Sequence, residues 1–192
     1  KAVYESMVSE PQSNKLPVLY KAAQLLGSVF DLDKLLNSIL ALIFEALPVQ
    51  RGYILIVSGE DDTPQIHATL SCEKSDKGPP IRNNIIQHVI DHEEAMLTLD
   101  AQERSGFEGA ESIVAHNIHS AMCAPLFGRE AIAGIIYVDS GDAPTPYRKG
   151  DLELLTAIAN VVGVAVENAR LYEETVKQER LAAVGQATAD LG

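Results

Sequence analysis

Hydrophobic positions near the N-terminus repeat every three or four residues, and this spacing predicts two amphipathic helices. The first helix is expected over about 17–30, with Leu19 and Leu26 on its apolar face. The second is expected over about 31–47, because Asp31 is a good N-cap and Pro48 cannot continue a helix. The polar residues before Leu16 are predicted to form a linker.

The pattern then changes to short apolar and alternating runs, which predict strands. The run RGYILIV (51–57) and the alternating QIHATL (65–70) flank turn residues, so they predict a hairpin. The runs at 118–127 and 131–140 predict a second hairpin. Between the hairpins we expect a short helix from Asn83 or Asn84, an edge strand at 95–99, and a helix near 111–116.

A long helix is predicted from Asp151 to Leu181. At 1.5 Å per residue it would span about 45 Å. A domain of about 150 residues has a radius of gyration near 15 Å, so the far end of this helix is expected to project. The order of elements predicts an α+β fold, with an antiparallel sheet and helices on its faces.

Three stretches resemble the GAF domain: DLDKLLNSILALIFEALPVQRGYILIV, SAMCAPLFGREAIAGIIYVDS and DLELLTAIANVVGVAVENARLYEE. The resemblance implies a six-stranded antiparallel sheet, with the first and last helices on one face. It also implies a pocket on the other face, under short helices and loops. On this basis we expect a linker at 1–15, a GAF domain at 16–174 and a signalling helix at 175–192.

The final stretch LAAVGQATADLG resembles the start of the dimerisation and phosphoacceptor helix of sensor histidine kinases. In that family the next residue would be the phosphorylated histidine, and this chain stops at Gly192. The resemblance implies that the segment belongs to a longer, cytoplasmic sensor kinase. The segment itself is expected to be no enzyme and to hold no cofactor.

Composition narrows the choice of partners. The chain has 15 Lys and Arg against 27 Asp and Glu, a net charge of -12, which repels nucleic acid and anionic lipid. No apolar run reaches the roughly 18 residues needed to span a membrane. The two cysteines, Cys72 and Cys123, form no disulfide framework and fit a reducing cytoplasm.

By their place in a GAF fold, five residues are candidates to line a ligand pocket: Thr98, Asp100, Ser112, His116 and Met122. The expected ligand is an unknown small molecule; the alternative is a cavity filled by its own side chains. Cyclic nucleotide is disfavoured, because only Tyr147 and Asp151 match the family's cyclic-nucleotide pattern and Leu152 stands where it has Glu.

Two other groups of residues, histidine pairs and a cysteine, are candidates for metal or redox sites. His88 and His92 share a helix face at a spacing that can bind zinc, but surface histidines and no metal are expected. The pair His116 and His119 falls at a helix-to-strand junction that separates the rings. Cys123 is expected to be a small buried residue, which disfavours a methionine-sulfoxide reductase-like enzyme.

The long helix also carries a heptad seam, which predicts a homodimer through the first and last helices. Its residues are Leu155, Ile158, Val162, Ala165, Ala169, Tyr172, Val176 and Glu179. Glu179 is a poor core residue, and the apolar positions resume out of phase at Leu181 and Val184. We therefore expect a sensory module that signals through this phase break. A ligand-free dimerisation module is the alternative.

Overall fold

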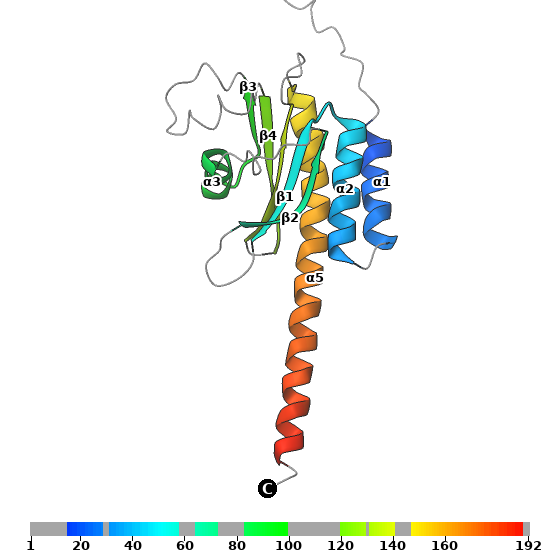
Figure 1. The fold of residues 1–192 in the computed structure, drawn as a ribbon, viewed down its shortest axis with the longest axis vertical. Coiled ribbons are helices and arrows are strands. Elements are labelled where there is room, and N and C mark those ends of the chain that lie inside the picture. The colour runs from blue at the N-terminus through cyan, green and yellow to red at the C-terminus, as the bar shows by residue number, and fades with distance from the viewer. Residues whose placement is uncertain are drawn as a thin grey trace, which may run out of the picture.

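The computed structural model describes residues 15–28, 31–57, 64–72, 83–99, 120–129, 131–140 and 147–189. It confirms the predicted α+β class (Figure 1). The elements are α1 (Leu16–Ser28), α2 (Leu32–Ala46), β1 (Arg51–Val57), β2 (Pro64–Ser71), α3 (Asn83–His92), β3 (Met96–Leu99), β4 (Ser120–Phe127), β5 (Ile132–Asp139) and α5 (Lys149–Ala189). The predicted helix near 111–116 lies outside the described residues.

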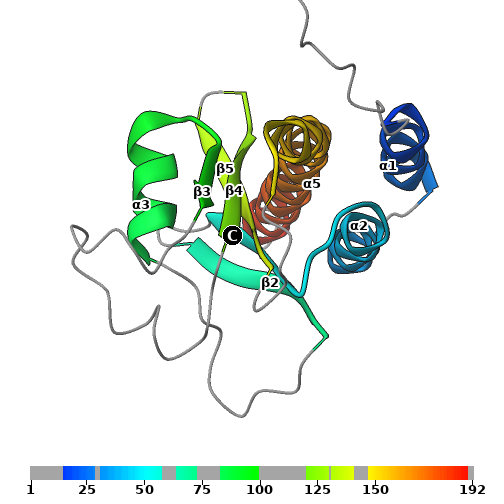
Figure 2. The ribbon, with the colours of Figure 1, turned by 90° about the horizontal axis from the view of Figure 1, so that it is seen from above.

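The strands form one antiparallel sheet in the order β2-β1-β5-β4-β3. Five strands lie within the described residues, where the family resemblance implied six. Helices α2 and α5 cover one face of the sheet, with α1 packed against these two helices, and α3 covers the other face, as the view from above shows (Figure 2). Both predicted hairpins and the edge strand are confirmed.

Side chains alternate between two hydrophobic clusters, one on each face of the sheet. The helix-side cluster is the larger and joins α2 and α5 to Ile54, Met122 and Ile136. The α3-side cluster contains Tyr53 and Tyr137, which belong to the same strands. The sheet is therefore a single layer of backbone between two packed interiors.

Two helix starts are fixed by carboxylates. Asp31 caps α2 as predicted, since its side chain accepts the Lys34 backbone N–H at 3.1 Å. This bond lowers the pKa of the Asp31 carboxyl. Asp151 lies in the first turn of α5 and accepts the Arg148 backbone N–H at 2.8 Å. It therefore reaches back to stabilise a start at Lys149, two residues before the predicted one.

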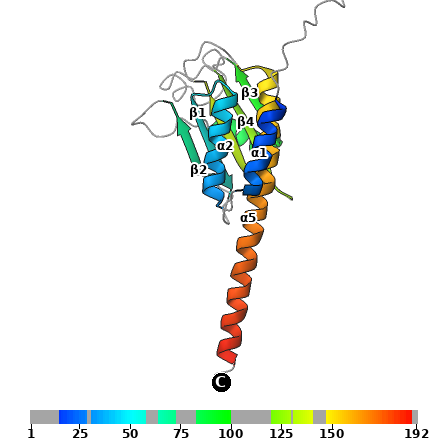
Figure 3. The same cartoon turned by 90° about the vertical axis from the view of Figure 1, so that its right-hand side faces the viewer.

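Helix α5 has 41 residues, which corresponds to a length of about 60 Å. Its first half packs on the sheet, with buried residues as far as Val166. The second half leaves the domain and extends away from it, as predicted (Figures 1 and 3). By length and composition alone, Lys149–Ala182 would also suffice for a membrane span, although the sequence contains no continuous apolar run of that length. The first half of this helix lies in the core of the domain, which accounts for part of that apolar content.

Candidate functional site

The face of the sheet under α3 is the candidate sensory face. Strand register places Met96, Cys123, Tyr137 and Tyr53 side by side across β3, β4, β5 and β1. The two tyrosine rings lie 6.2 Å apart between centroids. Above them, Ile85, Ile86 and Val89 of α3 pack into the same cluster. This face is apolar and aromatic at its centre.

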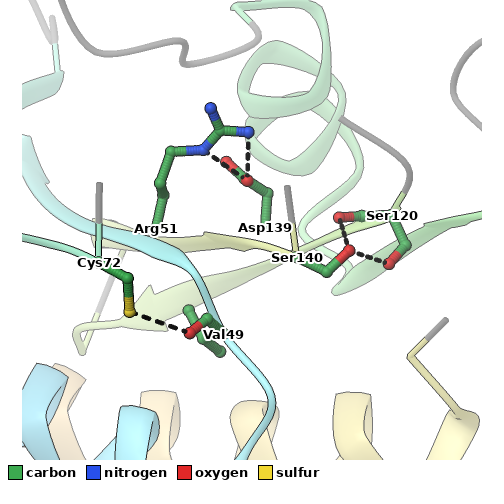
Figure 4. Close-up of polar contacts among 6 residues, drawn as sticks. All are labelled: Val49, Arg51, Cys72, Ser120, Asp139 and Ser140. Atoms are coloured by element: carbon green, nitrogen blue, oxygen red, sulfur yellow. Dashed lines mark hydrogen bonds and ion pairs between the residues drawn. The ribbon is translucent and has the colours of Figure 1, made fainter. Parts of the chain in front are cut away.

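The next row of the same face is polar. Register aligns Thr98, Ala121, Asp139 and Arg51, again across the four neighbouring strands. The Arg51 Nε and Nη2 atoms each donate to Asp139 Oδ1 at 2.8 Å. The two side chains are 8% and 0% exposed, so this is a buried ion pair. Figure 4 shows both on the α3 side of the strands.

Burial governs the acid–base behaviour of this face. It raises the pKa of the Tyr53 hydroxyl, and the nearby Asp139 carboxylate raises it further. Burial alone strongly raises the pKa of the Cys123 thiol. Both groups are therefore neutral at physiological pH. In the polar row, the charges of Arg51 and Asp139 neutralise each other.

The predicted pocket residues divide between the two faces. Thr98 pairs with Ala121 and therefore shares the α3 face, where its Oγ1 is buried without a hydrogen-bond partner in the described structure. Met122 is fully buried on the opposite face, in the helix-side cluster, and does not line the candidate site. Asp100, Ser112 and His116 lie outside the described residues.

Sequence reasoning missed the Arg51–Asp139 pair. The signal was present, since each is a charged residue at the end of an otherwise apolar strand run. Charged side chains are almost never fully buried unless paired, so an arginine in a strand predicted to be buried implies a charged partner. The partner itself lies 88 residues away and only the fold identifies it.

The two cysteines lie in different surroundings. Cys123 is buried on the α3 face, whereas Cys72 is exposed just after β2. Cys72 is directed toward the Val49 carbonyl, at an Sγ···O distance of 4.0 Å, on the helix side of the strands (Figure 4). Tyr147, considered above for cyclic nucleotide, is buried in the helix-side cluster. It therefore does not face the candidate site.

The predicted dimer and signalling residues fall into three groups along the molecule. Leu155, Ile158 and Val162 are fully buried against the chain's own sheet. Leu19, Leu26 and Ala165 are partly buried against the same cluster. The remaining four are Ala169 and Val176, half-buried, and Tyr172 and Glu179, exposed.

Apolar residues remain uncovered on both α1 and α5. Leu16 and Tyr20 of α1 are 74% and 66% exposed, and Val164 and Tyr172 of α5 are 57% and 72% exposed. The surface around Tyr172 continues through Val176 to Leu181 as a shallow depression. These residues, rather than Leu19 or Leu155, are open to a partner in this conformation.

The model of the GAF domain family matches residues 31–166. The chain belongs to the GAF domain family. The matched residues contain the whole sheet, α3 and the buried half of α5. GAF domains are sensory modules, and both faces described above lie within this one.

Known proteins resemble the chain at modest identity. The nitrogen fixation protein AnfA of Azotobacter vinelandii is 26% identical over 157 residues; the match covers 79% of this chain and 30% of that protein. The phycocyanobilin-bound GAF domain of a cyanobacterial phytochrome superposes with a TM-score of 0.68 at 17% identity, covering 83% and 97% of the two chains. The GAF domain of a putative sensor histidine kinase from Pseudomonas syringae pv. tomato gives 0.60 at 16%, covering 86% and 93%. The structural matches show the shared fold.

Proposed function

We propose that this chain is the sensory and dimerisation segment of a cytoplasmic sensor histidine kinase. A small molecule or protein partner acts at the α3 face, and α5 carries the change to the kinase. The observation that carries this proposal is that the same strands pack against α3 on one face and against α2 and α5 on the other. On β4, Cys123 faces α3 whereas its neighbours Met122 and Ala124 face the helices.

This arrangement couples the two faces mechanically. A rearrangement under α3 must move β4 or β5, and α5 packs on both strands. Interiors are close-packed, so such a displacement is transmitted rather than absorbed. A ligand shifts the equilibrium only if it binds the two states with different affinity, typically by about 1–3 kcal/mol.

Helix α5 is the proposed output. It remains helical through Glu179, which is the charged residue of the heptad seam. The break gives the projecting helix two packings of similar energy, and a switch requires such a pair. The histidine kinase assignment rests on the C-terminal sequence LAAVGQATADLG and is supported by the fold shared with the Pseudomonas sensor kinase domain.

Autophosphorylation of the full-length protein tests this output. Glu179→Leu, or one residue inserted beside it, is expected to change the activity or its response to stimulus. Gln178→Ala is the matched control, since Gln178 is exposed and belongs neither to the seam nor to the depression around Val176. Unchanged output in both Glu179 variants would falsify the switch.

The second candidate is a ligand-free dimerisation module. It is favoured by the close packing under α3, where Ala121, Cys123 and Tyr137 are at most 1% exposed. Native mass spectrometry of the chain purified from its own cells distinguishes the two. A stoichiometric bound mass supports the sensor, and its loss in an Asp139→Asn variant that remains folded locates it at the α3 face.

An enzymatic role is the least supported. Cys123 is buried with a raised pKa, so its thiol is protonated and shielded from substrate. Cys72 is exposed on a different part of the surface. A methionine-sulfoxide reductase assay with a thiol reductant is expected to show no activity, and activity lost in Cys123→Ser would establish the enzyme.

A further inference from the structure

We propose that His88 and His92 form a binding site for one divalent transition-metal ion, of which Zn²⁺ is the reference case. The two residues lie one turn apart on α3, beside its buried face; His88 is partly buried and His92 is exposed. Their rings stack, with centroids 4.1 Å apart and planes inclined by 23°. Each Zn–N bond of about 2.0–2.1 Å lies in the plane of its ring, so one of the stacked rings must turn for both to bind the same ion.

The tautomer of His92 supports metal binding. Its Nδ1 lies 3.0 Å from the His88 carbonyl oxygen. A carbonyl oxygen only accepts hydrogen bonds, so Nδ1 carries the proton in this contact. In the neutral ring Nε2 then has a free lone pair. A hydrogen bond from one ring nitrogen to a backbone carbonyl is also how proteins orient metal-binding histidines.

The surroundings keep this pair accessible and leave it two protein ligands. The inward side of α3 is occupied by Ile85, Ile86 and Val89, which leaves His88 partly exposed and His92 exposed. The Asp91 carboxylate accepts the Gln87 side-chain amide at 2.8 Å and is already engaged. Within the described residues no group of three or more His, Cys, Asp or Glu is arranged to hold a metal, so water completes the coordination.

Metal binding would stabilise the C-terminal turn of α3. The bridge joins residues 88 and 92 across that turn, and the next residue, Glu93, has a left-handed φ of 56°. An ion that binds the folded helix and not the unfolded chain shifts the folding equilibrium toward the folded state. Because α3 covers the candidate sensory face, the ion would stabilise that cover.

Isothermal titration calorimetry with Zn²⁺ on the whole chain tests the site. We expect one ion per chain, with affinity at least about tenfold weaker in His88→Gln and in His92→Gln. His67→Gln is the matched control, because His67 lies on β2 near Asp33 and should leave the affinity unchanged. Nuclear magnetic resonance should show Zn²⁺ shifting the ring signals of His88 and His92 together.

Two outcomes would overturn the proposal. The first is no measurable heat and no ring shift at millimolar Zn²⁺. The second is binding that persists in the His88→Gln/His92→Gln double variant, which would locate the ion at other residues. The folded state of the variants is checked by far-ultraviolet circular dichroism, so lost binding is not mistaken for unfolding.

Discussion

Gly163 of α5 lies directly against the backbone of Phe127 at the end of β4. A Cβ at Gly163 would be 2.7 Å from the Phe127 backbone nitrogen and closer still to its carbonyl oxygen. Only glycine allows this approach, and the contact lies where α5 begins to leave the sheet. The close packing of α5 on β4 therefore depends on glycine, with no Cβ, at position 163.

Gly163→Ala is expected to destabilise the domain by about 1–3 kcal/mol, because the methyl group must push α5 away from β4. Gly27→Ala is the matched control: it is also a helical glycine, but its added Cβ meets nothing within 4 Å. That variant should lose no stability and gain at most about 1 kcal/mol from helix propensity, since Gly27 lies in the last turn of α1. Urea denaturation of both measures the difference, and equal effects would contradict the close contact.

The Arg51–Asp139 pair should behave as a buried ion pair. Asp139→Asn leaves the guanidinium without its charged partner, and a loss of about 3–5 kcal/mol is expected. The Arg51→Met/Asp139→Leu double variant should recover most of that loss, since it removes both buried charges. A double-mutant cycle of Arg51→Met, Asp139→Leu and the double variant by urea denaturation measures the coupling, and additive losses would refute it.

Lys21 and Glu45 provide the surface reference for that cycle. Their side chains are 61% and 68% exposed, with a separation of 3.4 Å between Nζ and Oε2. Exposed pairs are typically worth at most about 1 kcal/mol. Lys21→Ala should therefore change stability far less than Asp139→Asn.

Burial of the Tyr147 hydroxyl should reduce the folding stability of the domain at alkaline pH. Burial raises the pKa of its hydroxyl, which has no hydrogen-bond partner in the described structure. Above about pH 10 the unfolded chain ionises this group while the folded chain does not, so stability falls as pH rises. Tyr147→Phe should gain about 1 kcal/mol at neutral pH and reduce the alkaline loss.

Chemical denaturation at pH 8 and pH 11 measures this effect. Tyr20→Phe is the control, because Tyr20 is 66% exposed and its loss of a hydroxyl should alter neither value. An alkaline loss that Tyr147→Phe leaves unchanged would assign it to other groups.

The proposed dimer should depend on the exposed apolar residues of α5. Tyr172→Glu places a charge at a 72%-exposed seam position, beside Glu173 and Glu174, and should shift a dimer toward monomer. Ile66→Glu is the control, since Ile66 is 44% exposed but lies on β2, away from the seam. Sedimentation velocity at micromolar concentration measures the oligomeric state of each variant. A chain that is monomeric without any substitution would refute the dimer itself.

The two thiols should differ sharply in reactivity. Cys72 is exposed and should react with a thiol reagent within the mixing time of the assay, whereas the buried Cys123 should react only when the domain opens. Cys72→Ser should remove the fast phase alone. Rapid modification of both thiols would show that the α3 face opens freely.

Local sequence predicted the elements well, because their signals are local. The apolar run at 51–57 and the alternation at 65–70 identified both strands of the first hairpin. Asp31 identified the start of α2 because an N-cap interaction spans only three residues. The projection of α5 followed from its predicted length against the size of a domain.

The sequence alone could not assign the strand faces. Alternation shows that Met122 and Cys123 point in opposite directions, but it does not say which points toward α3. Pairing with Leu97 and Val138 places Met122 on the helix side, and that register is a property of the sheet. The predicted pocket residue therefore belongs to the core beneath α5.

The hydrophobic periods of the sequence thus determined the helices, the strands, the α+β class and the long C-terminal helix. Only the tertiary structure decided that Leu155 to Val162 face their own sheet while Tyr172 remains exposed. It also decided that Arg51 meets Asp139. The physical reason is common to both: periodicity fixes relative orientation within one element, whereas burial and charge pairing depend on which distant element packs against it.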